Sequence, residues 1–481
     1  MTEPPRPHAE APAAMRPADA VMWNIEVDPV LRSTVVAVAV LDRSPDWEVL
    51  TARLQEAIAL LPRLRQRVDP ARLPVGVPAW VDDEAFDLDY HLRRVRVPEP
   101  GTLRAVLDLA APMAMDAFDP ARPLWEFTLV EGLEDGGAAL IQKFHHSIMD
   151  GEGAIALERR LLDGAPRAVT PPAAVPAGDA SSLAAEPGPD RLVGLAALGR
   201  QGWSMGSRAL RFPAVVATTS WGAITQPATT LRTSARLARS IAKALAPVPE
   251  TESTMLQARG LSRRLETIDL LLEDLRAAGH ACGGTVNDAF LAGVVGGLAE
   301  YHRRHDAPVD TLHVTMPVSI RSKGDGLEGN RFAPVRFAVP AGITDPAARV
   351  RQLGEIAHDW QHEPFLQHTD ALATVLAWLP AEVAANVFGG MLKHVDAVAT
   401  NVAGLTEPAV LAGATIVREY AFAPPMGAAL NISLLSHGDR ACVGVVLDAA
   451  AVPDVECFKA SLVAGFDEVV AVADHHARRT A

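Results

Sequence analysis

A stretch rich in Pro, Ala, Ser and Gly, residues 164–190, divides the chain of 481 residues into two halves. It shows neither the alternation of a strand nor the periodicity of a helix, and this composition is typical of a linker or a long crossover. The sequence on either side mixes short apolar runs with segments of helical periodicity. At about 150 residues per domain, each half is long enough to bury its own core. We therefore predict two α/β lobes joined by a long connection.

In the first half we expect a disordered leader over residues 1–18 and an N-terminal lobe over residues 19–163. Short apolar runs, turn signals and helical periodicity predict the elements of this lobe, which are a strand at 35–40, a helix over 47–68, a hairpin of strands 125–130 and 138–144 around the turn-rich residues 134–137, and a helix over 152–162.

The second half begins after residues 164–250, which we predict to be a linker or crossover with Ala-rich helices. Residues 251–481 then form the C-terminal lobe. Its expected elements are a helix that carries Asn287 and Asp288, followed by strands at 312–320, 333–339, 430–436 and 441–447.

Composition excludes several classes of protein. A net charge of −14 argues against a general nucleic-acid binder. The three cysteines, Cys282, Cys442 and Cys457, include no Cys-x-x-Cys pair, so we expect a reducing compartment, no disulfide framework and no metal site. The N-terminus lacks the apolar segment of a signal peptide. The uncharged run 212–231 contains two prolines, which disfavours a membrane-spanning helix but permits a location at a membrane surface.

The strongest chemical signal is the motif His145-His146-Ser147-Ile148-Met149-Asp150-Gly151, placed where a predicted strand ends and a helix begins. Adjacent residues of a strand point to opposite faces, so only one of the two histidines can face a given cleft. This geometry disfavours one metal held by both rings and favours one imidazole as a general base with the other in support. The structural alternative is a buried histidine pair that closes a hairpin, with Asp150 as a helix cap.

Beyond this motif, the sequence resembles the bacterial wax ester synthase/diacylglycerol acyltransferase family, one of the CoA-dependent acyltransferases that share His-His-x-x-x-Asp-Gly. The resemblance covers nearly the whole chain. Its segments occur in the order of the family and comprise Phe86–Leu92, Pro123-Leu124-Trp125-Glu126, Leu129–Leu133, Thr285-Val286-Asn287-Asp288, Met316–Arg321, Gly329-Asn330, Leu430–Ser433 and Val452-Pro453-Asp454.

The resemblance implies a two-lobed α/β fold of the chloramphenicol-acetyltransferase-like type, with mixed sheets, helices and a cleft between the lobes. It implies transfer of a long-chain acyl group from acyl-CoA to a diacylglycerol or a long-chain fatty alcohol. The implied site residues are His146 as general base, His145 in support, Asp150 and Gly151 in the loop, and Asn287, Asp288 and Arg321 lining the cleft.

The same resemblance implies acyl-CoA as a co-substrate and no cofactor or metal. Because its products partition into lipid, we expect a cytoplasmic protein that associates peripherally with membranes or lipid droplets. An ion pair between Asp150 and Arg321, across the two lobes, is a further hypothesis. Asn287 and Asp288 have an equally simple structural interpretation, since Thr285 and Asn287 are good caps for the helix that follows.

Where the family often has Asn-Val-Pro-Gly-Pro, this chain has Asn401-Val402-Ala403-Gly404-Leu405, and the departure leaves the choice of acceptor open. Two other functions stay open beside the main one. The first is a condensation-type ester or amide synthase that uses another donor or acceptor. The second is a lipid-droplet binding protein whose catalysis is vestigial.

Two further segments match known sequence motifs, and we interpret both matches as chance. Residues 202–206 match Gly-x-Ser-x-Gly around Ser204, but a predicted helix precedes them, whereas a nucleophile elbow needs a strand. Residues 324–329 match Gly-x-Gly-x-x-Gly but lead into a strand, so no helix N-terminus is present to hold a pyrophosphate.

Overall fold

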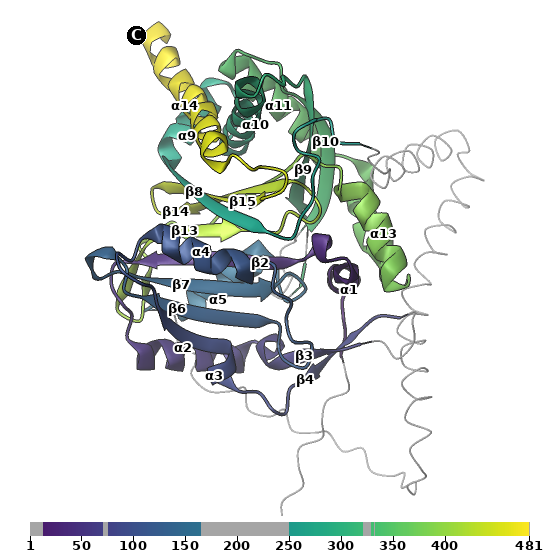
Figure 1. The fold of residues 1–481 in the computed structure, drawn as a ribbon, viewed down its shortest axis with the longest axis vertical. Coiled ribbons are helices and arrows are strands. Elements are labelled where there is room, and N and C mark those ends of the chain that lie inside the picture. Colours follow the sequence, from purple (N-terminus) through teal and green to yellow (C-terminus); the bar gives the residue numbers. More distant parts are fainter. Residues whose placement is uncertain (1–12, 71–75, 165–249, 321–328, 331, 481) are drawn as a thin grey trace, which may run out of the picture. The chain divides into compact units, whose positions relative to one another are not determined.

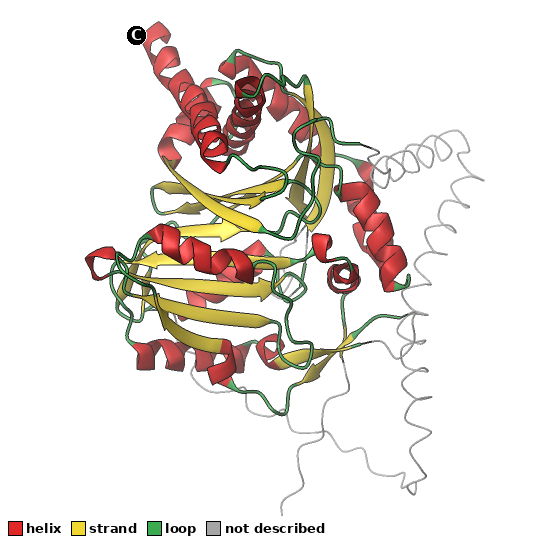
Figure 2. Ribbon diagram, in the orientation of Figure 1, coloured by secondary structure: helices red, strands yellow, loops and turns green. Residues whose placement is uncertain are grey.

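The computed structural model describes residues 13–70, 76–164, 250–320, 329–330 and 332–480. The described strands form two six-stranded sheets and one three-stranded sheet, and both large sheets belong to the same compact unit. Figure 1 shows the two large sheets as two layers, with the second half of the chain contributing to both. Figure 2 shows that helices flank these layers.

The N-terminal sheet has the strand order β12-β13-β2-β7-β6-β5. Neighbouring strands are antiparallel except for β5 and β6, which are parallel. The strands are β2 (Thr34–Leu41), β5 (Leu92–Arg96), β6 (Trp125–Glu131), β7 (Ala138–His145), β12 (Val410–Leu411) and β13 (Ala414–Phe422). The predicted hairpin of β6 and β7 is thereby confirmed.

Strands β12 and β13 correct the expected division of the chain. They come from the second half, yet β13 pairs with β2, with Phe422 opposite Val36. Residues 251–481 therefore do not form a separate lobe, because two of their strands complete the sheet of the first lobe. A sequence pattern that defines a strand does not define its partner, so this crossover was outside what periodicity can predict.

Alternation along β2 explains how the N-terminal sheet is covered. Val36, Val38 and Val40 face one side, where they pack against α4 (Leu103–Met113) and strands of the other large sheet. Ala39 and Leu41 face the opposite side, where the core includes α2 (Trp47–Leu60) and α5 (Gly151–Leu161). Both faces of this strand are buried, which explains why it reads as an unbroken apolar run.

The helix predicted over residues 47–68 is wrong in its second part. Helix α2 ends at Leu60, and a short 3-10 turn, Pro62–Arg65, leads into β3 (Gln66–Asp69). Pro62 lacks an amide proton and disfavours helical backbone at the residue before it, so the helix cannot continue through this point. The apolar residues beyond it kept helical spacing by coincidence.

The leader predicted over residues 1–18 is wrong for its last part. Ala13–Ala14 form β1, which pairs with β4 (Ala79–Asp82), and β4 pairs in turn with β3. Met15 is buried in the main core, and α1 begins at Pro17 and ends at Asn24. Residues 13–15 are held by sheet pairing and by the buried side chain of Met15.

The C-terminal sheet has the order β10-β9-β11-β14-β15-β8 and is mixed, since β11 runs parallel to both β9 and β14. Its strands are β8 (Arg263–Leu271), β9 (Thr311–Ser319), β10 (Phe332–Pro340), β11 (Ala397–Val402), β14 (Leu430–His437) and β15 (Arg440–Asp448). The strands predicted near 312–320, 333–339, 430–436 and 441–447 are confirmed.

The helices of the second half are α9 (Leu272–Ala281), α10 (Val286–Arg304), α11 (Pro346–Gln361), α12 (Thr369–Ala377), α13 (Ala381–Leu392) and α14 (Val455–Thr480). Helix α3 (Leu88–His91) precedes β5 in the first half. Helices α12 and α13 pack on α1 and the turn after it, as Figure 1 shows for α13. Within the described ranges, no helix has both the length and the apolar character that crossing a membrane requires.

Candidate active site

The two motif histidines have different surroundings, as strand geometry predicts. His145, the last residue of β7, is 1% exposed and packs between the rings of Trp23 and Phe118. Its Nδ1 accepts a hydrogen bond from the Ser147 backbone N–H at 3.1 Å, which leaves the ring proton on Nε2. That nitrogen lies 3.2 Å from Glu26 Oε1. His145 is therefore a buried residue of the loop and does not line the cavity described below.

Glu26 gives this histidine an anionic neighbour. Burial alone would raise the pKa of Glu26, but the hydrogen bonds from the His145 ring and from the Ser33 N–H outweigh it, so that the pKa lies below its usual value. Arg32 acts in the same direction. A carboxylate beside the ring fixes the orientation of His145 and, through it, the start of the motif loop.

His146 lies on the other side of the loop and lines a cavity of about 250 Å³. Its Nδ1 lies 2.7 Å from Oδ1 of Asn330. The amide of Asn330 has a definite orientation, because its Nδ2 donates to Asp19 Oδ1 at 3.0 Å and to the His146 carbonyl at 2.7 Å. Since Oδ1 can only accept, His146 carries its proton on Nδ1, and Nε2 keeps the free lone pair that a base needs.

The electrostatics keep this imidazole neutral. Burial lowers the pKa of His146, and the Asn330 hydrogen bond and the charge of Asp150 offset only part of the effect. A general base with a lowered pKa is unprotonated near neutral pH and accepts a proton only when a partner such as a reacting hydroxyl offers one. The ring of Phe332, 5.1 Å away between centroids, covers one side of the imidazole.

Asp19 supports the Asn330 amide from α1. It is 1% exposed, and it also accepts a hydrogen bond from the Asn330 backbone N–H at 2.9 Å. Burial raises the pKa of Asp19 to about 6, against the opposing effects of the Asn330 hydrogen bonds and the charge of Arg63. Gly329 makes this approach possible, because its φ is +78° and a Cβ at this position would lie 2.9 Å from Asp19 Oδ2.

Asp150 and Gly151 begin helix α5. Asp150 caps the helix by accepting a hydrogen bond from the Gly153 N–H at 3.0 Å, and it also lines the His146 cavity. A Cβ on Gly151 would lie 3.0 Å from Cγ2 of Val402, so the absence of a side chain lets the helix approach β11 of the other sheet. Arg321 lies outside the described residues, and its pairing with Asp150 stays a prediction.

Asn287 and Asp288 lie at the start of α10 and line a second cavity of about 430 Å³. Thr285 caps the helix, and the Asp288 carboxylate accepts from the Thr285 backbone N–H at 2.7 Å, which completes a capping box. The helix cap is therefore Thr285 with Asp288, whereas Asn287 takes no part in it. Neither Asn287 nor Asp288 lines the cavity of His146.

The two cavities adjoin each other. They share the lining residues Pro317, Ser319 and Asn401, which lie on β9 and β11. The cavity of His146 is mainly apolar, with walls that include Met22, Phe332, Phe388, Leu392, Val402 and Met426. A larger share of the wall of the second cavity is polar, and its polar side chains include Asn287, Asp288 and His358. An apolar pocket with a few polar groups beside the base suits a long-chain substrate.

Asn330, Asp19 and Glu26 were missed as site residues by sequence reasoning. Asn330 did carry a signal, because Gly329-Asn330 is one of the segments of the family resemblance. Asp19 and Glu26 carried none, since both come from the poorly patterned start of the chain. Trp125, from another segment of the resemblance, is a packing residue: it is fully buried at the start of β6 and donates from Nε1 to the Leu64 carbonyl at 2.8 Å.

Comparison with solved structures defines the class of this fold. The chain resembles the wax ester synthase/diacylglycerol acyltransferase from Marinobacter aquaeolei VT8 with a TM-score of 0.62 and 22% identity, covering 96% of this chain and 100% of that one. It also resembles the first condensation domain of the CDA synthetase, with a TM-score of 0.58 and 17% identity over 97% of both chains. The fold is the two-lobed α/β fold of CoA-dependent acyltransferases and condensation domains.

Sequence comparison then identifies the family. The model of the wax ester synthase/diacylglycerol acyltransferase catalytic domain matches residues 15–290, and that of the WS/DGAT C-terminal domain matches residues 328–469. A Mycobacterium tuberculosis H37Rv protein that carries the provisional name diacylglycerol O-acyltransferase is 36% identical over 96% of this chain and 93% of its own length. The protein belongs to the wax ester synthase/diacylglycerol acyltransferase family.

Proposed function

We propose that this acyltransferase moves a long-chain acyl group from an acyl-CoA thioester to the hydroxyl of a diacylglycerol or a long-chain fatty alcohol, with His146 as general base. The observation that carries the proposal is the hydrogen bond from His146 Nδ1 to Asn330 Oδ1, beside a mainly apolar cavity. It holds the imidazole in the tautomer that accepts a proton at Nε2.

In the proposed reaction the acceptor hydroxyl gives its proton to Nε2 while its oxygen attacks the thioester carbonyl carbon. The tetrahedral intermediate then collapses, the C–S bond breaks, and the thiolate takes the proton back from Nε2. The products are an ester and free CoA, and no covalent acyl-enzyme forms. The charge of Asp150 favours the transient imidazolium, because it raises the pKa of His146.

The test measures thiol release from palmitoyl-CoA with hexadecanol, a diacylglycerol or no acceptor, and identifies the products by chromatography. The variants are His146→Ala and, as a control, His280→Ala, since His280 is an exposed residue that lines neither cavity. We expect ester formation to be lost only in His146→Ala.

Each other result rejects part of the proposal. Thiol release without ester would indicate a hydrolase and would return attention to Ser204. Ligand that copurifies without turnover would favour a lipid-binding role, and turnover with an amine or carrier-bound acyl group alone would favour a condensation-type synthase.

We further propose that the protein associates peripherally with a membrane or lipid droplet, as its lipid substrates require. The segment first suggested for this contact, 212–231, lies outside the described residues. Exposed valines on α12 and α13, Val375, Val383 and Val387, support the proposal, because α13 also contributes Phe388 to the wall of the His146 cavity. The amount of protein recovered in the membrane fraction should fall when residues 212–231 are deleted, or in the double variant Val383→Glu/Val387→Glu. If both proteins are recovered there as the wild type is, the proposal is rejected.

A further inference from the structure

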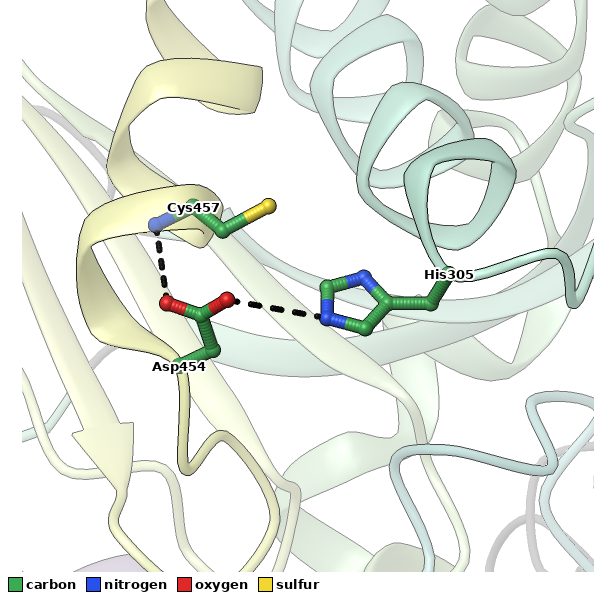
Figure 3. Close-up of side chains that lie close together, drawn as sticks. All are labelled: His305, Asp454 and Cys457. Atoms are coloured by element: carbon green, nitrogen blue, oxygen red, sulfur yellow. Dashed lines mark hydrogen bonds and ion pairs between the residues drawn. The ribbon is translucent and has the colours of Figure 1, made fainter.

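Three side chains of ligand type converge where helices α10 and α14 meet, away from both cavities. They are His305, which directly follows α10, Asp454, which directly precedes α14, and Cys457 in the first turn of α14. One ligand atom from each lies within 4.8 Å of the others. Figure 3 shows the imidazole, the carboxylate and the thiol around a common space. None of the three lines either cavity described above.

The ring of His305 is oriented by the backbone of its own helix. Its Nδ1 lies 2.9 Å from the Tyr301 carbonyl oxygen, which can only accept, so Nδ1 carries the proton. Nε2 therefore keeps its lone pair and lies 3.8 Å from Asp454 Oδ2 (Figure 3). A hydrogen bond from one ring nitrogen to a backbone carbonyl, with the other nitrogen free, is the arrangement found in metal-binding histidines.

The carboxylate of Asp454 is oriented in a similar way. Its Oδ1 accepts a hydrogen bond from the Cys457 backbone N–H at 3.2 Å, as a helix cap does. Capping occupies only this oxygen, and Oδ2 is the atom that lies towards His305. The side chain of Cys457 is partly exposed, so its thiol is accessible to an ion from solution.

From this convergence we propose that His305, Asp454 and Cys457 bind a Zn²⁺ ion. A nitrogen, a thiolate and a carboxylate oxygen form a donor set that suits zinc, whereas Mg²⁺ and Ca²⁺ require mostly oxygen ligands. Zinc binds such donors at about 2.0–2.3 Å, so the three side chains need only a small inward movement. Asp454 is exposed, which leaves a fourth position for water.

The charges of this site balance. Binding displaces the proton of the Cys457 thiol to solvent, and the thiolate and the Asp454 carboxylate then neutralise the two charges of the ion. The sequence has no Cys-x-x-Cys pair, and for this reason no metal site was expected. The proposed site does not need such a pair, because its ligands come from two helix ends that are distant in the sequence.

The position of the site indicates a structural role. Helices α10 and α14 pack against each other along their length, with the Phe290 and Phe466 rings stacked at 6.1 Å. The ion would join the end of α10 to the start of α14. The opposite end of α10 carries Asn287 and Asp288 at the second cavity. A bound ion should therefore stabilise the C-terminal sheet and its helices without taking part in acyl transfer.

The test titrates metal-free protein with Co²⁺ as a spectroscopic probe and with Zn²⁺ in competition with a chromophoric chelator. We expect one equivalent to bind, with the near-ultraviolet charge-transfer absorption of a cobalt thiolate. Cys457→Ser should abolish that absorption. His305→Gln and Asp454→Asn should weaken Zn²⁺ binding by at least about tenfold, since even residues that only support metal ligands contribute this much.

Cys282→Ser is the matched control, because Cys282 is also partly exposed but lies outside the cluster. It should bind Co²⁺ and Zn²⁺ as the wild type does. Zn²⁺ should also raise the midpoint of thermal unfolding of the wild type and of Cys282→Ser, but not of Cys457→Ser. The proposal is overturned if no stoichiometric binding occurs, or if binding survives Cys457→Ser or is lost in Cys282→Ser. In those cases the three side chains serve only as helix caps and an ion pair.

Discussion

Asp19 accepts two hydrogen bonds from Asn330, one from its backbone N–H and one from Nδ2, although the residues are 311 positions apart. Through this contact helix α1 determines which way the Asn330 amide points. The amide in turn determines which nitrogen of His146 carries the proton. The base of the proposed reaction therefore depends on a buried carboxylate that has no contact with the reacting atoms.

Asn330 is predicted to be a positioning residue. Asn330→Leu removes the acceptor for Nδ1, so kcat should fall by about 100-fold, the lower range for loss of general-base catalysis. Because the Asn330 hydrogen bond raises the pKa of His146, its loss should also move the acidic limb of the pH–rate profile to lower pH. Steady-state kinetics across pH on folded protein would check both effects, and an unshifted profile at wild-type kcat would contradict the assignment.

Asp19 should make stability depend on pH. Its folded pKa of about 6 exceeds the ordinary value of 3.8, so the folded state binds the proton more tightly than the unfolded chain does. Its contribution to stability is therefore complete below about pH 4 and is lost as the pH rises through 6, a change of about 3 kcal/mol for two pKa units.

The isosteric variant Asp19→Asn isolates this effect, because its amide oxygen still accepts the hydrogen bonds from Asn330. Urea unfolding at pH 4.5 and pH 7.5 should show that the wild type loses more stability over this range than the variant does. Equal losses in the two proteins would show that Asp19 titrates normally.

The two roles of Asp150 can be separated. Asp150→Asn keeps a capping side chain but removes the charge, so stability should hardly change while the acidic limb of the pH–rate profile moves to lower pH. Asp150→Ala also removes the helix cap, which should lower the free energy of unfolding by about 1 kcal/mol. Chemical unfolding and pH-dependent kinetics of both variants would measure the two effects. If Asp150→Asn has the pH–rate profile of the wild type, capping the helix is the sole function of Asp150.

The predicted ion pair with Arg321 has its own test in a double-mutant cycle of Asp150→Asn and Arg321→Gln. Paired residues should show effects on kcat that are not additive. If the two effects on kcat are strictly additive, or if a folded Asp150→Ala protein keeps full activity, the predicted ion pair is rejected.

Gly151 should tolerate no side chain while Val402 is present. Gly151→Ala places a Cβ 3.0 Å from Val402 Cγ2 and should destabilise the protein by about 1–3 kcal/mol through overpacking. Val402→Ala removes the opposing methyl groups, so the double variant should recover most of the stability lost by Gly151→Ala. Thermal unfolding of the single and double variants would measure this coupling, and a Gly151→Ala protein as stable as the wild type would show that the contact is loose.

Local patterns predicted local structure well and long-range contacts poorly. Two strand-like segments, 125–130 and 138–144, on either side of the turn-rich residues 134–137 were sufficient to predict the hairpin of β6 and β7. The rule that neighbouring strand residues face opposite sides separated His145 from His146 correctly. The partner of His146 could not be found in this way, because Asn330 and Asp19 reach the site by tertiary contacts that no periodicity records.

The pairing of β13 with β2 also has a consequence for the order of folding during synthesis. When the ribosome has made the first 163 residues, β2 already has β7 on one side, but its other edge exposes unpaired N–H and C=O groups. That edge is completed only after residue 422 has left the ribosome. The nascent N-terminal half should thus be open to aggregation for most of translation, and fragments ending in 164–250 should be poorly soluble unless the remainder is co-expressed.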